Sequence, residues 1–440
     1  MNIKTEYISR RQFLGRTVAG AAAALTFPTI IPASALGKDG AVAPSERIVM
    51  GCIGWGQIAP GDLGECIRHA DVQFVAVCEL DSERRERARK TVEDYYGAKS
   101  TSGSHRGCAA YHDFRDMIAR PDIDAVIVAV PDHWHALMVV AAARAGKDIY
   151  CEKPMSLTIE QGKRMRDAVQ RYGRVLQTGS QSRSKRNTRH AGELVQNGRI
   201  GQVKTVKVGL PKSPYFPKQP VMEVPKGFDY DFWLGPAPWA PYTEKRCHIH
   251  YRWILDYSDG MIADWGAHQL DLAQWGLGMQ LSGPAWIEGK GNFPRDGLTD
   301  VATEFHFTCG YGNGAILECS TDLEGGVRFE GTEGWVHTGH GGFFRSQPES
   351  LVNEVIGPNE IHLYDSPDHH RNFLDCVRSR GVPIAPVEVG HRSATVCHMA
   401  NITMLLGRRL GWDPVEEHFI NDPEADRMMS RAMRAPWNLI

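Results

Sequence analysis

The chain of 440 residues is 42% hydrophobic and 23% charged, and its formal net charge at pH 7 is -2. This composition is typical of a soluble globular protein, and the small net charge provides no electrostatic basis for binding nucleic acid. The length exceeds that of one ordinary domain and indicates two. Eleven tryptophans and 18 histidines are a generous supply for stacking on sugars and for proton transfer.

The amino terminus resembles a twin-arginine export signal. A twin arginine in Ser9-Arg10-Arg11-Gln12-Phe13-Leu14 precedes an apolar run, and Ala33-Ser34-Ala35 offers a small-residue cleavage site. The alternative, an amphipathic helix, lacks a polar face. We predict a signal over residues 1–35, a linker over 36–45, and export to the periplasm or beyond. No other stretch reaches the roughly 18 apolar residues of a membrane span, so no membrane association is expected after signal removal.

Cysteine placement favours buried free thiols over disulfides. Six of the ten cysteines lie in apolar runs rather than at the spacings of a disulfide framework, namely Cys52, Cys78, Cys151, Cys309, Cys319 and Cys397. The sequence has no C-x-x-C motif and no cysteine-histidine cluster with zinc spacing. We therefore expect no metal site.

A glycine-rich turn follows the first predicted strand, residues 47–53. Gly54-Trp55-Gly56-Gln57-Ile58-Ala59 fits G-x-G-x-x-A, the dinucleotide-binding pattern. The first glycine permits a tight turn, and the second lets backbone N–H groups approach a pyrophosphate. Pro60 and Gly61 are expected to delay the next helix by a turn. The predicted cofactor contacts here are Gly54, Trp55, Gly56 and Gln57.

The second predicted strand, Val72–Cys78, ends at an acidic residue. Glu79 lies about twenty residues beyond the glycines, where a carboxylate accepts hydrogen bonds from the adenosine ribose and repels a 2′-phosphate. The sequence therefore predicts NAD rather than NADP as the cofactor.

Further strands and helices alternate up to residue 178, which predicts a doubly wound parallel sheet over residues 46–178. An apolar run over residues 125–130 leads into Pro131-Asp132-His133-Trp134-His135 and a helix over 136–145. For His133 and His135, cofactor binding and ordinary packing are both open. The next strand leads into Cys151-Glu152-Lys153-Pro154, where proline keeps Lys153 out of the α region. Taken alone, these four residues also fit a plain turn with a solvated lysine.

These motifs together resemble the glucose-fructose oxidoreductase / inositol dehydrogenase (Gfo/Idh/MocA) family. The resemblance implies an amino-terminal Rossmann domain, a carboxyl-terminal α/β domain over residues 179–440 with a large open, mainly antiparallel sheet, and an active site between them. It also implies a cis Lys153-Pro154 bond and a homo-oligomer, dimer or tetramer, formed through the open sheet. The cofactor site is then expected to include Glu79, Pro131, His133, His135, Glu152 and Lys153.

The second half of the chain carries the predicted catalytic residues. Asp264 and His268 are spaced i, i+4 at the start of a predicted amphipathic helix, so their side chains share one face. A surface ion pair is the ordinary alternative, but D-x-G-x-H-x-x-D matches a family motif that faces the nicotinamide beside the lysine of E-K-P. On this basis Lys153 stabilises the developing alkoxide, His268 accepts the proton and Asp264 orients the substrate.

Substrate contacts are predicted at Gln181, His250, Arg252 and Trp233. The last lies in an irregular stretch over residues 212–241, where Trp233, Trp239 and Tyr242 fit a sugar-stacking wall, a subunit contact or plain packing. Alternation from residue 301 and a turn over 310–314 predict an antiparallel hairpin. Helices are expected over residues 369–380, closed by Gly381, and 391–410, closed by Gly411.

The sequence thus predicts an exported oxidoreductase that transfers hydride from a secondary hydroxyl of a sugar, glycoside or cyclitol to tightly bound NAD. Carbon 3 of a glycoside is one candidate position, and a redox-neutral cycle is expected. Two alternatives remain open: an NAD-dependent glycosidase or epimerase acting through a transient 3-keto sugar, and a non-catalytic exported sugar-binding protein.

Overall fold

The computed structural model describes residues 42–100 and 103–439. The predicted export signal and residues 36–41 of the predicted linker lie outside these ranges. The chain divides into two compact units, residues 1–47 and 48–440. In the first, η2 (Pro44–Glu46) is a short 3-10 turn, and the Arg47 guanidinium donates to the Val42 carbonyl.

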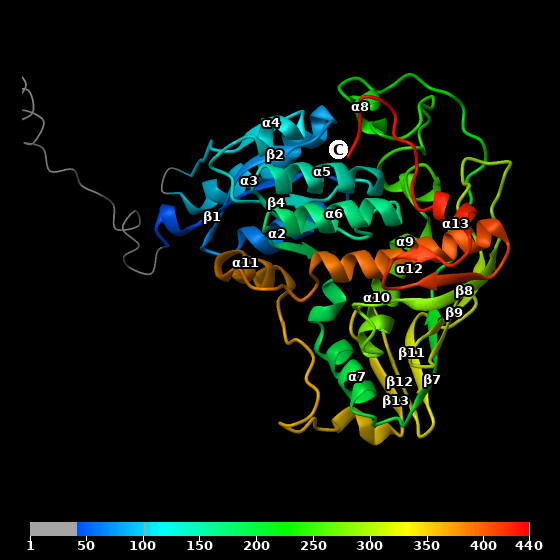
Figure 1. Ribbon diagram of the computed structural model, residues 1–440. Helices are drawn as coiled ribbons and strands as arrows, with labels where there is room; N and C mark the ends of the chain where they lie inside the picture. Colours follow the sequence, from blue (N-terminus) through cyan, green and yellow to red (C-terminus); the bar gives the residue numbers. More distant parts are fainter. Residues whose placement is uncertain (1–41, 101–102, 440) are drawn as a thin grey trace, which may run out of the picture. The chain divides into compact units, whose positions relative to one another are not determined.

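A six-stranded parallel sheet forms the first half of the second unit (Figure 1). Its strand order is β3-β2-β1-β4-β5-β6, which reverses direction between β1 and β4. The predicted doubly wound sheet is therefore confirmed. Sequence reasoning missed only β3, whose three residues are too few to show alternation. The strands are β1 (Ile48–Ile53), β2 (Val72–Cys78), β3 (Ala109–Tyr111), β4 (Ala125–Val128), β5 (Asp148–Cys151) and β6 (Leu176–Thr178).

Helices cover both faces of this sheet. One face packs against α4 (Phe114–Ile118), α5 (Asp132–Arg144) and α6 (Ile159–Arg171). The other packs against α2 (Ala59–Ile67), α3 (Ser82–Lys99) and α11 (His369–Ser379). Because α11 comes from the far end of the sequence, the first core is built from both ends of this unit.

Two predicted helix starts are wrong. α2 is not delayed but begins at Ala59, since Pro60 falls in the first turn, where its missing N–H is not needed. α5 begins at Asp132 rather than at residue 136, which places His133 and His135 in its buried first turn. Thr158 caps α6, accepting a hydrogen bond from the Gln161 backbone N–H.

A nine-stranded sheet forms the second half, in the order β13-β12-β11-β7-β10-β9-β8-β14-β15. Only the β7–β10 pair is parallel, so the predicted open, mainly antiparallel sheet is confirmed. Its strands are β7 (Val203–Gly209), β8 (Pro284–Gly291), β9 (Phe305–Tyr311), β10 (Ile316–Ser320), β11 (Gly326–Gly331), β12 (Trp335–Thr338), β13 (Phe344–Gln347), β14 (Leu410–Asp413) and β15 (His418–Phe419).

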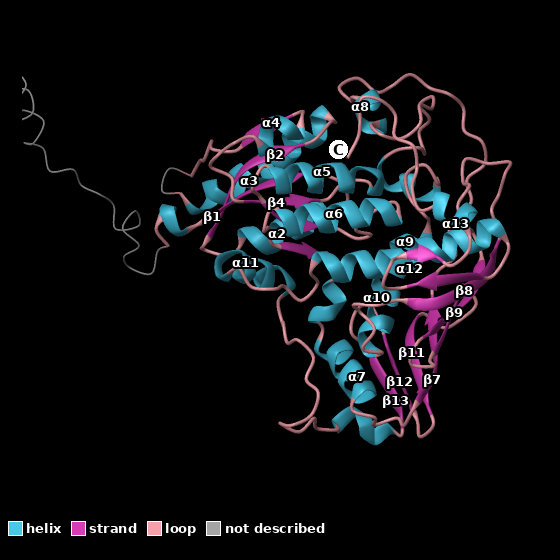
Figure 2. Cartoon of the chain, viewed as in Figure 1, coloured by secondary structure: helices cyan, strands magenta, loops and turns pink. Residues whose placement is uncertain are grey.

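One face of this sheet is covered by α7 (Arg186–Gln196), α10 (Gly266–Gly276) and α12 (Val387–Leu406), as Figure 2 shows. Shorter segments complete the domain: η3 (Gln181–Ser184), α8 (Tyr230–Leu234), η4 (His248–Trp253), α9 (Met261–Asp264), η5 (Glu349–Asn353) and α13 (Pro423–Arg427).

Several predicted boundaries in this half need correction. The helix predicted over residues 391–410 spans 387–406, because Gly407 in the left-handed region ends it and Leu410 already belongs to β14. Arg380, not Gly381, takes the left-handed position after α11. The alternating strand begins at Phe305 rather than at residue 301.

The prediction of one amphipathic helix that starts at Asp264 and includes His268 is also wrong. The chain forms two helices, α9 and α10, that meet at Trp265, and every residue of α10 is buried. Asp264 therefore ends one helix, while His268 lies in the first turn of the next.

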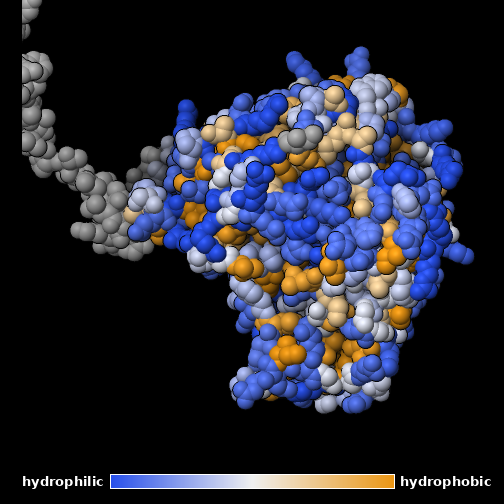
Figure 3. All heavy atoms as spheres, viewed as in Figure 1, coloured by the Kyte–Doolittle hydropathy of each residue, from blue (hydrophilic) through white to orange (hydrophobic). Residues whose placement is uncertain are grey.

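All ten cysteines lie in the described residues, and each is free and buried, as predicted. Hydrophilic side chains predominate on the face viewed in Figure 3, where apolar residues form small separate groups. Among the described helices, none has both the length and the apolar character needed to cross a bilayer.

Two buried histidines make stability depend on pH. Burial lowers the pKa of His133 and of His369 to about 3, whereas the unfolded chain titrates near about 6.5. Between these values the unfolded state binds protons that the folded state cannot. Stability is therefore fully present above pH ~6.5 and falls below it, by up to about 1.4 kcal/mol per pH unit for each histidine.

We expect acidification from pH 7 to pH 5 to destabilise His133→Phe less than the unmodified protein, measured as the shift of the urea unfolding midpoint, because the variant lacks one buried histidine. His362→Phe is the matched control, because His362 is exposed and should leave this shift unchanged. An equal shift in His133→Phe and the unmodified protein would contradict this account.

Candidate active site

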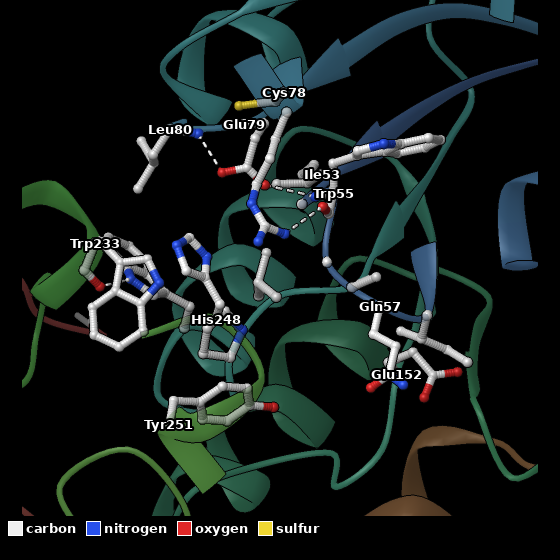
Figure 4. A pocket seen from close by; sticks show the side chains of 18 of the residues that line it. Ile53, Trp55, Gln57, Cys78, Glu79, Leu80, Glu152, Trp233, His248 and Tyr251 are labelled. Atoms are coloured by element: carbon white, nitrogen blue, oxygen red, sulfur yellow. Dashed lines mark hydrogen bonds between the residues drawn. The ribbon is translucent and has the colours of Figure 1, made fainter. Parts of the chain in front are cut away.

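The carboxyl ends of β1, β2, β4 and β5 open onto a cavity of about 720 Å³ (Figure 4). In open α/β sheets this edge, at the point where strand order reverses, is where ligands bind. The half of the unit with the parallel sheet contributes several predicted cofactor residues to the lining, namely Gly54, Trp55, Gly56, Gln57, Glu79, Pro131, Glu152 and Lys153. The half with the nine-stranded sheet closes the cavity with Phe228, Phe232, Trp233, His248, Ile249, Tyr251 and Arg252.

The glycine turn after β1 fits a pyrophosphate cradle. Gly54 has φ +90°, and a Cβ added there would lie 2.3 Å from the Ala129 carbonyl oxygen, so only glycine is accommodated. A Cβ at Gly56 would have no non-adjacent heavy atom within 4 Å, so this position faces open space. Backbone N–H groups can therefore approach a ligand closely, as a bound dinucleotide requires.

Glu79 ties this turn to the end of β2. Its Oε2 accepts from the Trp55 N–H at 2.7 Å and its Oε1 from the Leu80 N–H at 2.7 Å, as Figure 4 shows. The guanidinium of Arg84, which also lines the cavity, donates to the Trp55 carbonyl at 3.3 Å. A carboxylate fixed at this edge fits the ribose of NAD and repels a 2′-phosphate.

Lys153 and Asp264 meet although 111 residues separate them. The Lys153 Nζ donates to the Asp264 Oδ1 at 2.6 Å and to the Asp264 carbonyl oxygen at 2.8 Å. Both side chains are only 16% exposed. The Lys153-Pro154 peptide bond is cis, as the family resemblance implied.

Asp264 is held ionised by two cations. Burial alone would raise its pKa, but Lys153 and Arg252 outweigh that effect and lower it. The Arg252 Nε lies 3.4 Å from the Asp264 Oδ2. Two positive charges and one negative charge therefore share this corner of the site.

His268 lies beside this pair as a neutral imidazole. It is 7% exposed, and its Nδ1 is buried without a partner among the described residues. Burial, and next the ammonium of Lys153, lower the pKa of His268 well below its ordinary value. A neutral imidazole near an ammonium can accept a proton from a substrate hydroxyl. The His340 ring covers one side of it, with ring centroids 4.5 Å apart.

Glu152 is buried beneath Lys153. Burial, and then the nearby Asp62, raise the pKa of Glu152 to about 8. The Gln181 amide donates to the Glu152 Oε1 at 2.7 Å and also reaches the Tyr150 hydroxyl oxygen at 3.1 Å. Gln181, predicted as a substrate contact, thus holds Glu152 and is not among the residues that line the cavity.

The two histidines of α5 support the site from behind rather than lining it. The His135 Nδ1 lies 2.7 Å from the Pro154 carbonyl oxygen, so His135 supports the loop that carries Lys153. The His133 Nε2 lies 3.0 Å from the Trp233 carbonyl oxygen, and the Trp134 indole N–H donates to the same oxygen at 2.9 Å. These contacts join α5 to α8.

Only some of the predicted substrate contacts line the cavity. Trp233 and Arg252 line the cavity, whereas His250 is half-buried against Phe216 with ring centroids 5.1 Å apart. His248, which sequence reasoning did not select, does line it, with φ +56°. No sequence signal distinguishes the two histidines, because their positions depend on this backbone turn.

Buried ion pairs position the helices that carry Asp264 and His268. The Arg183 guanidinium donates to both carboxylate oxygens of Asp271 at 2.7 and 2.8 Å and so fixes α10 to η3. Asp259, just before α9, accepts from the Asn401 amide and the Arg431 guanidinium, each at 2.9 Å.

Comparisons with known proteins agree with this architecture. The chain is 26% identical over 282 residues to the scyllo-inositol 2-dehydrogenase (NAD(+)) of Bacillus subtilis, covering 61% of this chain and 72% of that protein. For the first curated relatives that it matches, the chain spans less than half of their length.

Solved structures share the fold. The WlbA dehydrogenase of Bordetella pertussis, in complex with NADH and UDP-GlcNAcA, matches with a TM-score of 0.62 at 19% identity, over 83% of this chain and 99% of that one. An aldose-aldose oxidoreductase of Caulobacter crescentus matches with a TM-score of 0.60 at 20% identity, over 83% and 99% of the two chains.

Two family models cover most of the described residues. The NAD-binding Rossmann fold of the oxidoreductase family matches residues 48–180, which confirms the prediction of NAD. The C-terminal alpha/beta domain of the same family matches residues 215–439. The chain therefore belongs to the Gfo/Idh/MocA oxidoreductase family.

Proposed function

We propose that the protein is an exported NAD-dependent oxidoreductase that acts on a secondary hydroxyl of a sugar, glycoside or cyclitol. The observation that carries this proposal is the Lys153 ammonium, which lines the cofactor cavity, is paired with Asp264 and lies near a neutral His268. The similarity to an inositol dehydrogenase and to an aldose-aldose oxidoreductase supports a polyhydroxylated substrate.

Lys153 is suited to bind the reacting hydroxyl. An ammonium has three N–H donors, and the carbonyl and carboxylate oxygens of Asp264 occupy two of them. The third remains for the substrate oxygen. As that oxygen loses its proton, the adjacent positive charge stabilises the growing negative charge.

His268 is suited to take that proton. Its lowered pKa keeps it unprotonated at neutral pH and therefore ready to accept. Asp264 remains ionised, which holds the ammonium in position. When bound, NAD supplies the acceptor for the hydride that leaves the substrate carbon.

A segment of the second domain closes over the cofactor cavity. The Ser82 N–H donates to the Gly227 carbonyl at 2.9 Å, and the Tyr251 hydroxyl donates to the buried Asp132 at 2.8 Å. Residues between these contacts, including Phe228 and Trp233, line the cavity.

The carboxyl-terminal residues fasten this segment. The Trp437 ring packs against Trp134 and Phe232, with centroid distances of 4.7 and 5.3 Å. The Arg434 guanidinium donates to the Asp231 carboxylate at 2.6 Å and to the Gly235 carbonyl at 2.9 Å. These described carboxyl-terminal residues thus lie against both α5 and α8 (Figure 1). We propose that this arrangement retains NAD between turnovers.

Retention suits an exported enzyme. The predicted twin-arginine signal implies work outside the cytoplasm, where free NAD is scarce and released NADH could not be recycled. The cycle is then redox-neutral: either one sugar is oxidised while another is reduced, or a transient ketone is formed and reduced again. A mass spectrum of the products from a glycoside panel separates ketone, epimer and cleaved sugar.

Replacing Lys153 tests the reaction centre. We expect Lys153→Met to lower the rate of bound-cofactor reduction by a saccharide panel roughly 10²–10⁴-fold, because the hydroxyl loses its cationic partner. Lys212→Met is the matched control, since Lys212 forms an exposed surface pair with Glu304. Unchanged cofactor reduction in Lys153→Met would show that the site is assigned incorrectly.

Cofactor retention can be measured directly. We expect the protein purified from the periplasmic fraction to release NAD only on denaturation, and Trp437→Ala to raise the rate of cofactor loss by up to about tenfold, because an aromatic contact of ~1 kcal/mol is removed. Trp239→Ala serves as control, because Trp239 is 66% exposed.

Export is checked in the same experiment. A variant with Arg10→Lys and Arg11→Lys should remain in the cytoplasm with its cofactor bound. Retention is contradicted by an empty cavity that fills only when NAD is added to the purified protein.

A further inference from the structure

A glycine-rich turn between β12 and β13 projects a single side chain into the site. In Gly339-His340-Gly341-Gly342 the Gly342 N–H donates to the Gly339 carbonyl at 2.9 Å, and Gly341 and Gly342 have φ of +96° and +75°. A Cβ at Gly339 would lie 3.0 Å from the Gly326 Cα. Three glycines thus allow a tight turn whose only side chain is an imidazole.

This imidazole covers the predicted proton acceptor. The His340 ring lies over the His268 ring with centroids 4.5 Å apart and an angle of 36° between the planes, and it meets the Trp265 ring at 5.4 Å. His268 is buried, whereas His340 is exposed. His340 therefore stands between His268 and solvent.

Ser182 fixes the orientation of His340. The Ser182 Oγ lies 2.9 Å from the His340 Nδ1, and Ser182 itself is buried. A serine hydroxyl can donate to an unprotonated ring nitrogen and accept from a protonated one. This single contact consequently suits His340 both before and after it gains a proton.

The charges around the two rings destabilise the protonated form of His268. His268 is faced by Lys153, His340 and His369, and burial together with Lys153 lowers its pKa. His340 is faced by Lys153 and Lys185, and the partial desolvation of its ring, together with these ammonium groups, lowers its pKa as well. A proton accepted by His268 is therefore placed beside an ammonium, without an acidic partner, and is released readily.

We propose that His340 carries the proton from His268 to solvent. This inference rests on the proposed function. In the oxidation step the substrate carbon loses a hydride to the cofactor, and its hydroxyl loses a proton to His268. That proton then passes to His340 and leaves to water, so the alcohol becomes a ketone with no other reactant.

Because the rings are tilted and stacked rather than joined by a hydrogen bond, proton transfer from His268 to His340 requires one bridging water or a small rotation of His340. Because glycines flank His340 on both sides, they leave room for such a rotation. Sequence reasoning had assigned His340 no role, since the turn that carries it lies far along the chain from both catalytic motifs.

Two substitutions separate proton transfer from packing. His340→Phe keeps an aromatic ring over His268 but has no ring nitrogen, whereas His340→Gly leaves a space that added imidazole can fill. In a stopped-flow experiment on the cofactor-loaded protein, saccharide is added, and cofactor reduction and proton release to a pH indicator are recorded together. His362→Ala is the control, because His362 is exposed and its Nε2 contacts the Gly357 carbonyl oxygen at 2.9 Å.

In the unmodified protein we expect proton release to keep pace with cofactor reduction. In both His340 variants the rate of proton release should fall by at least about tenfold. This loss is smaller than the 10²–10⁴-fold expected when a primary acid–base group is removed. In these variants the rate of proton release should rise with pH and with buffer concentration. Added imidazole should restore it in His340→Gly and not in His340→Phe.

Two results would overturn the proposal: proton release in His340→Phe that matches the unmodified protein, or a slow His340→Gly that imidazole does not restore. Both leave the proposed function intact as long as cofactor reduction still requires Lys153. Cofactor reduction that persists in Lys153→Met would instead refute the proposed function, independently of the His340 variants.

Discussion

The contact between Lys153 and Asp264 is the constraint on which the site depends. It joins the loop after a strand of the parallel sheet to the end of α9, across 111 residues of sequence. Both groups are largely buried, and removing the Asp264 carboxylate would leave the buried ammonium uncompensated, at a cost of about 3–5 kcal/mol. The lysine is therefore oriented by the second domain as much as by its own loop.

Further buried polar contacts keep that pair in register. Arg183 with Asp271, and Arg431 with Asp259, anchor the two short helices that meet at Trp265. Hydrogen bonds of ionised groups fix direction as well as distance, which apolar packing does not do. Because the chain breaks between α9 and α10, Asp264 faces the Lys153 ammonium while His268 is covered by the His340 ring.

Sequence predicted the parts of the site that follow strand ends. Gly54 and Glu79 come directly after a buried apolar strand and Lys153 two residues after one, so their places at one edge of the sheet follow from strand alternation alone. The family resemblance supplied Asp264 and His268. The doubly wound sheet was predictable for the same reason, apart from the three-residue strand β3 at its edge.

Other features depend on long-range packing that local patterns do not encode. His248 faces the cavity because of one left-handed backbone position, and His340 reaches His268 from a turn between two late strands. The raised pKa of Glu152 follows from burial beside Asp62, a residue ninety positions earlier in the chain. The packing of the carboxyl-terminal residues on α8 likewise follows no sequence motif, because it depends on two single side chains, Trp437 and Arg434.

The ten free cysteines have a consequence for the conditions under which this fold can exist. Burial raises the pKa of Cys52, Cys66 and Cys151 well above the usual range, which suppresses the thiolate, the form that reacts with oxidants and attacks disulfides. No covalent crosslink supports either sheet, because all ten thiols are free. The folded state is thus indifferent to the redox potential around it, and the same structure can persist in a reducing or an oxidising compartment.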